Sequence, residues 1–397
     1  MGTNPTLLTP MTIRGVTLRN RIVLSPMLTY AAEAGYVNDW HLVHLGKFAL
    51  GGCGLVFMES TKVDPGGLTT PRDCGIWKDD FIPGLQRITR FLKQHGAVAG
   101  IQLGHSGRKA RNSVPWQGRS QLPSPFPDVE DGTDWELVAP SPLPAGPGLE
   151  VPRELTIAEI HEMISGWGAA ARRAHEAGFD VLEVHGAHGY LIHQFLSPTA
   201  NQRTDAYGGS LENRMRFAIE VVTEVRRHWP EDKPLFFRVS AVDEDGGTLE
   251  ETIALSRALR ELGVDVIDCS TGGMPRRGER TMPTSGYGYQ VPYAEEIRHA
   301  ADIATMAVGL IIHADQAEAI LNEGRADLIA IGRELLHNPN WTFDAADKLG
   351  VEQPYNSAPE AYGYWMEKRR GGDVDFLAGL STRPSTWQAG IDAGGGV

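Results

Sequence analysis

The sequence predicts an α/β protein with a TIM-barrel fold, (β/α)8, in which eight parallel strands alternate with helices. One sequence pattern recurs: a helical stretch ends at a glycine, and a short apolar run follows. It occurs at Gly178, Gly263 and Gly324 and, less closely, at Gly96. Eight such apolar runs occur, each short enough to be a strand buried on both faces. None is followed by the G-x-G-x-x-G turn of doubly wound sheets. We therefore expect one barrel domain over residues 1–350.

The strands are expected in chain order, each separated from the next by a helical pattern. They are Arg21–Leu24, Leu55–Glu59, Val98–Leu103, Val181–His185, Leu235–Val239, Val266–Ser270, Met306–Leu310 and Leu328–Ile331. The glycine after each helix suits the C′ position, where left-handed backbone angles end a helix. Two helix starts carry capping boxes, Thr156 with Glu159 and Thr248 with Glu251.

Three segments lie outside this repeating pattern. Residues 9–21 are expected to form a hairpin that caps the bottom of the barrel before the first strand. Residues 105–155 form a long loop rich in Pro, Gly and Trp after the third strand, on the face where barrels carry their catalytic groups. Residues 351–397 form a tail whose last stretch is expected to be disordered.

Charge and composition narrow the class of partner. The 397 residues carry a net charge of −13 with no basic block, so nucleic acid and anionic membranes are poor partners and the ligand is expected to be a small molecule. No secretory signal and no apolar run of about 18 residues occurs, which predicts a cytoplasmic protein. The three cysteines form no CxxC pair, so we expect neither a disulfide framework nor a metal-binding cysteine motif.

The fourth strand ends in the polar cluster HGAHGY, with His185, His188 and Tyr190. A metal site including His193 would need histidines spaced along a helix, and Gly186 interrupts that spacing. Two imidazole N–H groups aimed at one point instead favour a hole for a carbonyl or anionic oxygen, and a nearby phenol can supply a proton. The pattern predicts an oxyanion-plus-acid site without metal.

The last two strands end in glycine-containing turns that suit a phosphate. Gly309 and Gly332 allow backbone N–H groups to approach a phosphate, and the guanidinium of Arg333 can donate two hydrogen bonds to it. Barrels often bind phosphate after strands seven and eight. The alternative is that both glycines serve only tight turns.

Two polar side chains interrupt apolar strands near the barrel mouth. Arg238 is expected to face an anion or an electron-rich group, because a buried unpaired guanidinium is costly. The alternative is an internal salt bridge to Glu183. Gln102 could satisfy both a donor and an acceptor edge of a ligand amide or pyrimidine.

These motifs together resemble the Old Yellow Enzyme family and, more closely, its bacterial branch of xenobiotic reductases. The resemblance rests on RNRIVLSPM (19–27), GIQLGHSGRKA (100–110) and above all the block from HGAHGYLIHQF to ENRMRF (185–217), with FFRVS, VDVIDCS and ADLIAIGREL as further matches. It extends from about Leu8 to Leu349. The resemblance implies a barrel that binds FMN and uses NADH or NADPH as a transient reductant.

Matching motif positions imply the flavin contacts. They are Ser25, Pro26, Met27, Leu28 and Ser60 along the isoalloxazine, Gln102 at its pyrimidine edge, Arg238 beside N1 and the C2 carbonyl, and Gly309, Gly332 and Arg333 at the phosphate.

The resemblance also implies the substrate site and the reaction. His185 and His188 bind a carbonyl or nitro oxygen, Tyr190 is the general acid, and Tyr30 lines the pocket. The implied activity is that of an ene-reductase, which passes hydride from NAD(P)H through FMN to activated C=C bonds of enones, maleimides or nitro compounds. A homo-oligomer, dimer or tetramer, is implied as well.

Two departures from the family pattern stand out. Leu28 occupies the position where the branch usually has a cysteine against the flavin. The tail is longer than in short members, although residues 362–370 resemble their ending, which makes the tail a candidate subunit contact. Neither an iron–sulfur cysteine cluster nor a second dinucleotide-binding domain follows, so the larger dienoyl-CoA reductases and trimethylamine dehydrogenase are not models for the whole chain.

Two other functional classes remain open from the residues. One is a non-redox phosphate-binding barrel, a lyase or isomerase, which would lack the colour of a flavin. The other is a flavin-binding module without turnover, against which the presence of all three of His185, His188 and Tyr190 argues.

Overall fold

The computed structural model describes residues 4–124, 135–274 and 286–370, and its centre is a closed barrel of eight strands. Around the barrel the strands are β3 (Ile22–Leu24), β4 (Leu55–Lys62), β5 (Val98–Gly104), β8 (Val181–Gly186), β9 (Leu235–Ser240), β10 (Val266–Ser270), β11 (Ala304–Ala307) and β12 (Leu328–Ile331). All neighbouring pairs are parallel. The predicted TIM barrel and the existence of its eight strands are confirmed.

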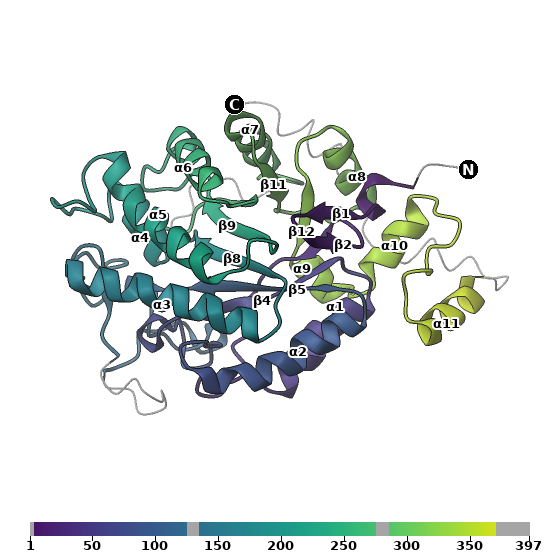
Figure 1. Cartoon of the computed structure of the whole chain (residues 1–397), viewed down its shortest axis with the longest axis horizontal. Coiled ribbons are helices and arrows are strands. Elements are labelled where there is room, and N and C mark those ends of the chain that lie inside the picture. The colour runs from purple at the N-terminus through teal and green to yellow at the C-terminus, as the bar shows by residue number, and fades with distance from the viewer. Residues whose placement is uncertain (1–3, 125–134, 275–285, 371–397) are drawn as a thin grey trace.

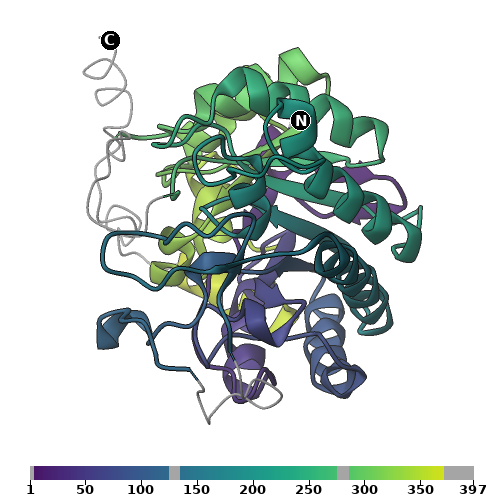
Figure 2. The same cartoon turned by 90° about the vertical axis from the view of Figure 1, so that its left-hand side faces the viewer.

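Helices surround the strands in both views (Figure 1, Figure 2). They are α1 (Asp39–Leu50), α2 (Ile82–Gln94), α3 (Ile157–Glu176), α4 (Leu191–Leu196), α5 (Leu211–His228), α6 (Leu249–Glu261), α7 (Val291–Ala301), α8 (Ala314–Asn322), α9 (Arg333–His337), α10 (Trp341–Lys348) and α11 (Glu360–Arg370). The glycines predicted to end helices have positive φ, +76° at Gly96, +86° at Gly178, +88° at Gly263 and +70° at Gly324. Left-handed backbone at these positions explains why glycine recurs there.

Two strands, β4 and β11, differ from the prediction by more than one residue at a boundary. Strand β4 continues to Lys62, past a register shift between Met58 and Ser60. Strand β11 begins and ends earlier than expected, because Gly309 (φ +113°) and Leu310 (φ +51°) turn out of the extended conformation. Apolar character alone did not reveal this turn, since the residues before and after it are equally apolar.

The predicted N-terminal hairpin is present as β1 (Met11–Ile13) and β2 (Val16–Leu18), which pair antiparallel. Ile13 and Leu18 join the apolar cluster inside the barrel, together with residues such as Phe57 and Phe236. The hairpin therefore covers the amino-terminal end of the barrel, leaving the opposite end for ligands.

One of the two predicted capping boxes is wrong. Thr156 and Glu159 form the full reciprocal box at α3. At α6 the Thr248 hydroxyl accepts the Glu251 N–H, but the Glu251 carboxylate binds the guanidinium of Arg214 at 2.6 Å. A charged partner on the neighbouring helix outcompetes a neutral backbone donor.

The two long excursions contain some regular structure. The loop after β5 carries short 3-10 turns and a two-stranded parallel ladder of β6 (Val138–Ala139) and β7 (Arg153–Glu154). In the tail, α11 stands apart from the barrel (Figure 1). The disorder expected for the last stretch of the tail concerns residues 390–397, which lie outside the described ranges. Among the helices of the described ranges, none is long and apolar enough to cross a membrane.

Candidate active site

A cavity of about 900 Å³ opens at the carboxyl ends of the barrel strands. Seven residues that the sequence nominated line it: Tyr30, His188, Tyr190, Arg238, Gly309, Gly332 and Arg333. Other residues that the sequence did not nominate also line the cavity. They are Thr69, Thr70, Lys109, Arg119, Glu244 and Gln290. These belong to loops, where no periodic pattern marks a residue as facing a ligand.

Other nominated residues lie directly around this cavity rather than in its wall. Ser25, Ser60, Gln102 and His185 are buried at the strand ends beneath it. Pro26, Met27 and Leu28 are half-buried in the segment after β3. Met27 lies close to the cavity wall, because a Cβ placed on Gly332 would be 3.2 Å from its sulfur.

His185, His188 and Tyr190 are brought together at the end of β8, as predicted. The His185 ring centroid lies 5.2 Å from that of His188 and 5.0 Å from that of Tyr190. Burial, and then the neighbouring His188, lower the pKa of His185 well below its usual value, so its ring is neutral. Its Nδ1 accepts the Ala187 N–H at 3.2 Å, which leaves the proton on Nε2 as a donor.

His188 is held in an unusual backbone conformation. Its φ is +59°, its N–H donates to Ser240 Oγ at 3.0 Å, and Lys109 Nζ donates to its carbonyl at 3.0 Å. Its Nε2 lies 2.8 Å from Ser270 Oγ. A left-handed backbone conformation is strained for a residue other than glycine, so the contacts around His188 must hold it in place.

His193 does not complete a metal site with these two histidines. Its Nδ1 accepts the Gly189 N–H at 2.9 Å and its Nε2 lies 3.0 Å from Asp243 Oδ2. Both ring nitrogens are therefore engaged in fixing the turn that carries His188. The role of His193 is to position this turn.

Burial raises the pKa of the Tyr190 phenol, and the negative field of Tyr30 adds to this, whereas a hydrogen bond with Thr69 opposes it. The phenol is therefore protonated at neutral pH and can act as a proton donor.

Arg238 does form an internal salt bridge, but the partner proposed from the sequence was wrong. Within the described residues its Nε pairs with Asp268 Oδ2 at 3.2 Å, on the adjacent strand β10, and its Nη1 donates to Ser25 Oγ at 3.3 Å. Glu183 instead accepts from Gln102 Nε2 at 2.8 Å. Burial, and then the charge of Asp268, raise the pKa of Glu183 well above its usual value, so it carries a proton.

The lining of this cavity suits a planar polar ligand with a phosphate. Arg238 reaches the wall from below, and Gly309 lies in the wall with a φ of +113°, a backbone conformation that residues with a side chain rarely adopt. With no side chain at Gly309, the turn after β11 presents its backbone to a ligand, and Arg333 lines the same cavity.

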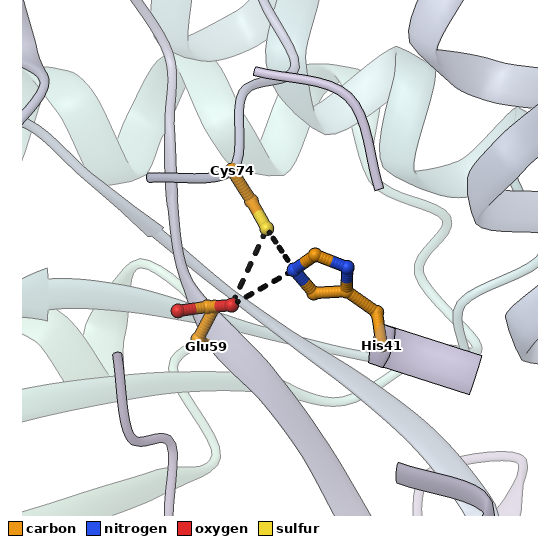
Figure 3. A group of neighbouring side chains, drawn as sticks. All are labelled: His41, Glu59 and Cys74. Carbon is orange, nitrogen blue, oxygen red and sulfur yellow. Dashed lines mark hydrogen bonds and ion pairs between the residues drawn. The ribbon is translucent and has the colours of Figure 1, made fainter. Parts of the chain in front are cut away.

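A second polar cluster, which the sequence did not predict, joins α1, β4 and the segment after β4 (Figure 3). His41 Nε2, Glu59 Oε1 and Cys74 Sγ lie within 3.2–3.4 Å of one another, and all three residues are buried. Such a trio could hold a metal ion. His41 Nδ1 lies 3.1 Å from the Asn38 backbone nitrogen, whose N–H it can accept, and 3.1 Å from Asn38 Oδ1. With Nδ1 as the acceptor, Nε2 carries the proton and donates to Glu59, and we interpret the cluster as a hydrogen-bond network.

This network fixes the segment after β3. The Glu59 carboxylate accepts both the N–H of Thr29 (2.5 Å) and its hydroxyl (2.8 Å). Thr29 lies between Leu28 and Tyr30, which has a positive φ of +55°. Glu59 therefore anchors two of the residues that the sequence assigned to the site.

Fold and cavity together define a class: a TIM-barrel protein that can hold a planar, phosphorylated ligand beside a histidine pair and a buried phenol. Residues 6–352 match the model of the NADH:flavin oxidoreductase / NADH oxidase family, and the chain belongs to this family, the Old Yellow Enzyme family. It is thus an NAD(P)H-dependent flavin oxidoreductase with FMN as cofactor. The interpretation as a non-redox barrel and that as a non-catalytic flavin module are both wrong.

Three relatives place the chain within the family. An NADPH dehydrogenase of Geobacillus sp. (strain WCH70) is 46% identical over 349 residues, covering 87% of this chain and 95% of the relative. Morphinone reductase is 26% identical with a TM-score of 0.72, covering 90% of this chain and 96% of that one. A 2-naphthoyl-CoA reductase has a TM-score of 0.76 at 26% identity over 89% of this chain, which spans only 53% of its length.

Proposed function

We propose that the protein is an ene-reductase that reduces activated C=C bonds of enones, maleimides or nitroalkenes. The observation that supports it most is the meeting of His188 and a protonated Tyr190 at one cavity wall, with a neutral His185 buried directly beside both rings. Two hydrogen-bond donors polarise a carbonyl or nitro oxygen, and the phenol delivers a proton to the α-carbon. Bound FMN supplies the hydride that it has received from the nicotinamide.

In this proposal the flavin contacts are those implied by the motifs. The ring would lie along Ser25–Leu28 and Ser60, with Gln102 and Arg238 at its polar edge. The phosphate would lie at Gly309, Gly332 and Arg333. Support comes from the cavity, whose wall includes Arg238 and all three of these phosphate residues.

Ser270 is expected to select the useful tautomer of His188. If the Ser270 hydroxyl donates to Nε2, which lies 2.8 Å away, the imidazole proton resides on Nδ1. The substrate oxygen would then accept from His185 Nε2–H and His188 Nδ1–H. Tyr30, whose ring centroid lies 5.8 Å from that of Trp116, would close the substrate side of the cavity.

The test of the proposed function is a substrate panel. Enones, maleimides and nitroalkenes are assayed with NADH and with NADPH, and alkene reduction is followed by product analysis. Turnover of at least one class supports the proposal. Rapid flavin reduction by a nicotinamide without reduction of any alkene in the panel would contradict it.

Leu28 leads to a prediction about redox potential. At the proposed position a thiol or hydroxyl could donate a hydrogen bond to the electron-rich reduced ring, and leucine cannot. One such bond is worth roughly 1.5–3 kcal/mol, or some tens of millivolts on a two-electron couple. Leu28→Cys and Leu28→Thr are expected to raise the potential by that amount in a redox titration, with faster flavin reduction and slower alkene reduction. Equal potentials would show that Leu28 only shapes the pocket.

We propose further that the protein is a homo-oligomer assembled in part through its tail. Helix α11 exposes Tyr362, Tyr364 and Trp365, and exposed aromatic residues clustered on one short helix are typical of interfaces. The full chain is expected to sediment as a dimer or tetramer, and a chain ending before Glu360 as a smaller species. A monomeric full chain would contradict this.

A further inference from the structure

A lysine is completely buried beside the proposed proton donor. Lys62, at the end of β4, and Asp73 are both 0% exposed, and their Nζ and Oδ2 atoms lie 3.7 Å apart. Lys62 Nζ also donates to Ser60 Oγ at 3.1 Å. A buried charge pair of this kind is costly to desolvate and contributes little net stability, so its presence at a site calls for another explanation.

Burial raises the pKa of Asp73, whereas the facing Lys62 and two hydrogen bonds favour its ionised form. Oδ2 accepts the Thr69 N–H at 2.8 Å and Oδ1 accepts the Thr70 hydroxyl at 2.7 Å. Burial lowers the pKa of Lys62, whereas the charges of Asp73 and then of Glu59 oppose this change. In this pair the ammonium and the carboxylate each favour the charged form of the other.

Both members of the ion pair reach Tyr190. The Lys62 ammonium lies 4.9 Å from the centroid of the Tyr190 ring, a cation–π distance. Asp73 fixes the backbone of Thr69, whose side chain is hydrogen-bonded to the Tyr190 hydroxyl. The Thr69 hydroxyl is held in turn by Ser106 at 2.8 Å. One ion pair thus contacts the ring directly and the hydroxyl through a single threonine.

We propose that the Lys62–Asp73 pair positions the proton donor: Asp73 orients Tyr190 through Thr69, and the Lys62 ammonium favours the phenolate that remains after proton transfer. This inference rests on the proposed role of Tyr190 as the acid. When the phenol gives up its proton, negative charge spreads into the ring, and the ammonium on the ring face attracts the product more strongly than the starting phenol. An interaction that strengthens along the reaction lowers the barrier.

The test follows the two half-reactions of the flavin-loaded enzyme separately by stopped flow. Lys62→Met is expected to slow reoxidation by an enone on the order of 10-fold, the size of a lost desolvated cation–π contact. Flavin reduction by NADPH is expected to be unchanged. The matched control is Lys47→Met on α1, which removes a cation 4.8 Å from the Phe48 ring and is expected to change neither rate.

A double-mutant cycle distinguishes this inference from the proposed function. In the Tyr190→Phe background, Lys62→Met is expected to have no further effect on reoxidation. The same 10-fold loss in that background would overturn the inference while leaving Tyr190 as the acid. If Tyr190→Phe alone has no effect, the acid assignment fails instead. Since a lone buried Asp73 could prevent folding, Lys62→Met/Asp73→Asn, which removes both charges, is measured alongside. It is expected to slow reoxidation as well, but by less than Lys62→Met, because the charge of Asp73 raises the pKa of Tyr190. A double variant as fast as the wild type in a correctly folded protein would overturn the inference.

A second readout needs neither turnover nor flavin. Difluorotyrosine, whose phenol is more acidic than that of tyrosine, is placed at position 190, and fluorine NMR follows its ionisation. In Lys62→Met the midpoint is expected to rise by about one pH unit, equivalent to the 10-fold loss in rate. An unchanged midpoint would show that the ammonium does not act on the phenol and would overturn the inference.

Discussion

Replacing Tyr190 by phenylalanine is expected to slow alkene reduction by about 100-fold or more, the contribution of a lost general acid. Flavin reduction by NADPH is expected to remain nearly intact, because hydride transfer from the nicotinamide needs no proton from this phenol. Stopped-flow measurement of both half-reactions with cyclohexenone as the oxidant checks both expectations. Unchanged reoxidation would assign the proton to water or to another group.

The pH dependence of reoxidation provides a second check on the same assignment. Burial raises the pKa of Tyr190 above its usual value of about 10, so the acid stays protonated throughout the neutral and mildly alkaline range. The reoxidation rate is therefore expected to be flat there and to fall only as the phenol ionises at higher pH. A fall centred below pH 10 would indicate a different acid. Tyr190→Phe serves as the control, since its residual reoxidation rate should not fall at high pH.

The second large effect concerns the histidine pair. A para-substituted phenol is expected to bind as phenolate, accepting from His185 and His188, and to give a long-wavelength charge-transfer band with the oxidised flavin. Each hydrogen bond to a charged oxygen is worth roughly 1.5–3 kcal/mol. His185→Ala/His188→Ala is therefore expected to weaken phenolate binding by at least about 100-fold and to abolish the band while FMN remains bound.

Two outcomes of that experiment would point to the alternatives. Wholesale loss of flavin in the double variant would assign the histidines to the cofactor site. A rate that changes with added zinc or chelator would show that a metal takes part after all. Ser270→Ala offers a milder comparison, because it removes only the hydroxyl 2.8 Å from His188 Nε2. It is expected to weaken phenolate binding by no more than about 10-fold, the value of one neutral hydrogen bond.

The fold could be predicted because its signals are local. The glycines at 96, 178, 263 and 324 end helices through their own backbone angles, and the apolar runs after them are long enough for a strand and too short for a helix. Most of the residues nominated for the active site followed from the same pattern, since parallel strands in a barrel bring their carboxyl ends to one face, whereas Tyr30 followed from the family resemblance. Seven of them line the cavity.

By itself, the sequence determined the order of strands and helices, the closed barrel, and the face on which His188, Tyr190 and Arg238 meet. Only the tertiary structure decided the partners of buried charges: Asp268 for Arg238, Asp73 for Lys62, and the His41–Cys74 pair for Glu59. The physical reason is that backbone angles and periodicity act within a few residues. Pairing of buried charges depends instead on which side chains barrel closure brings within a few ångströms, and no local pattern records that.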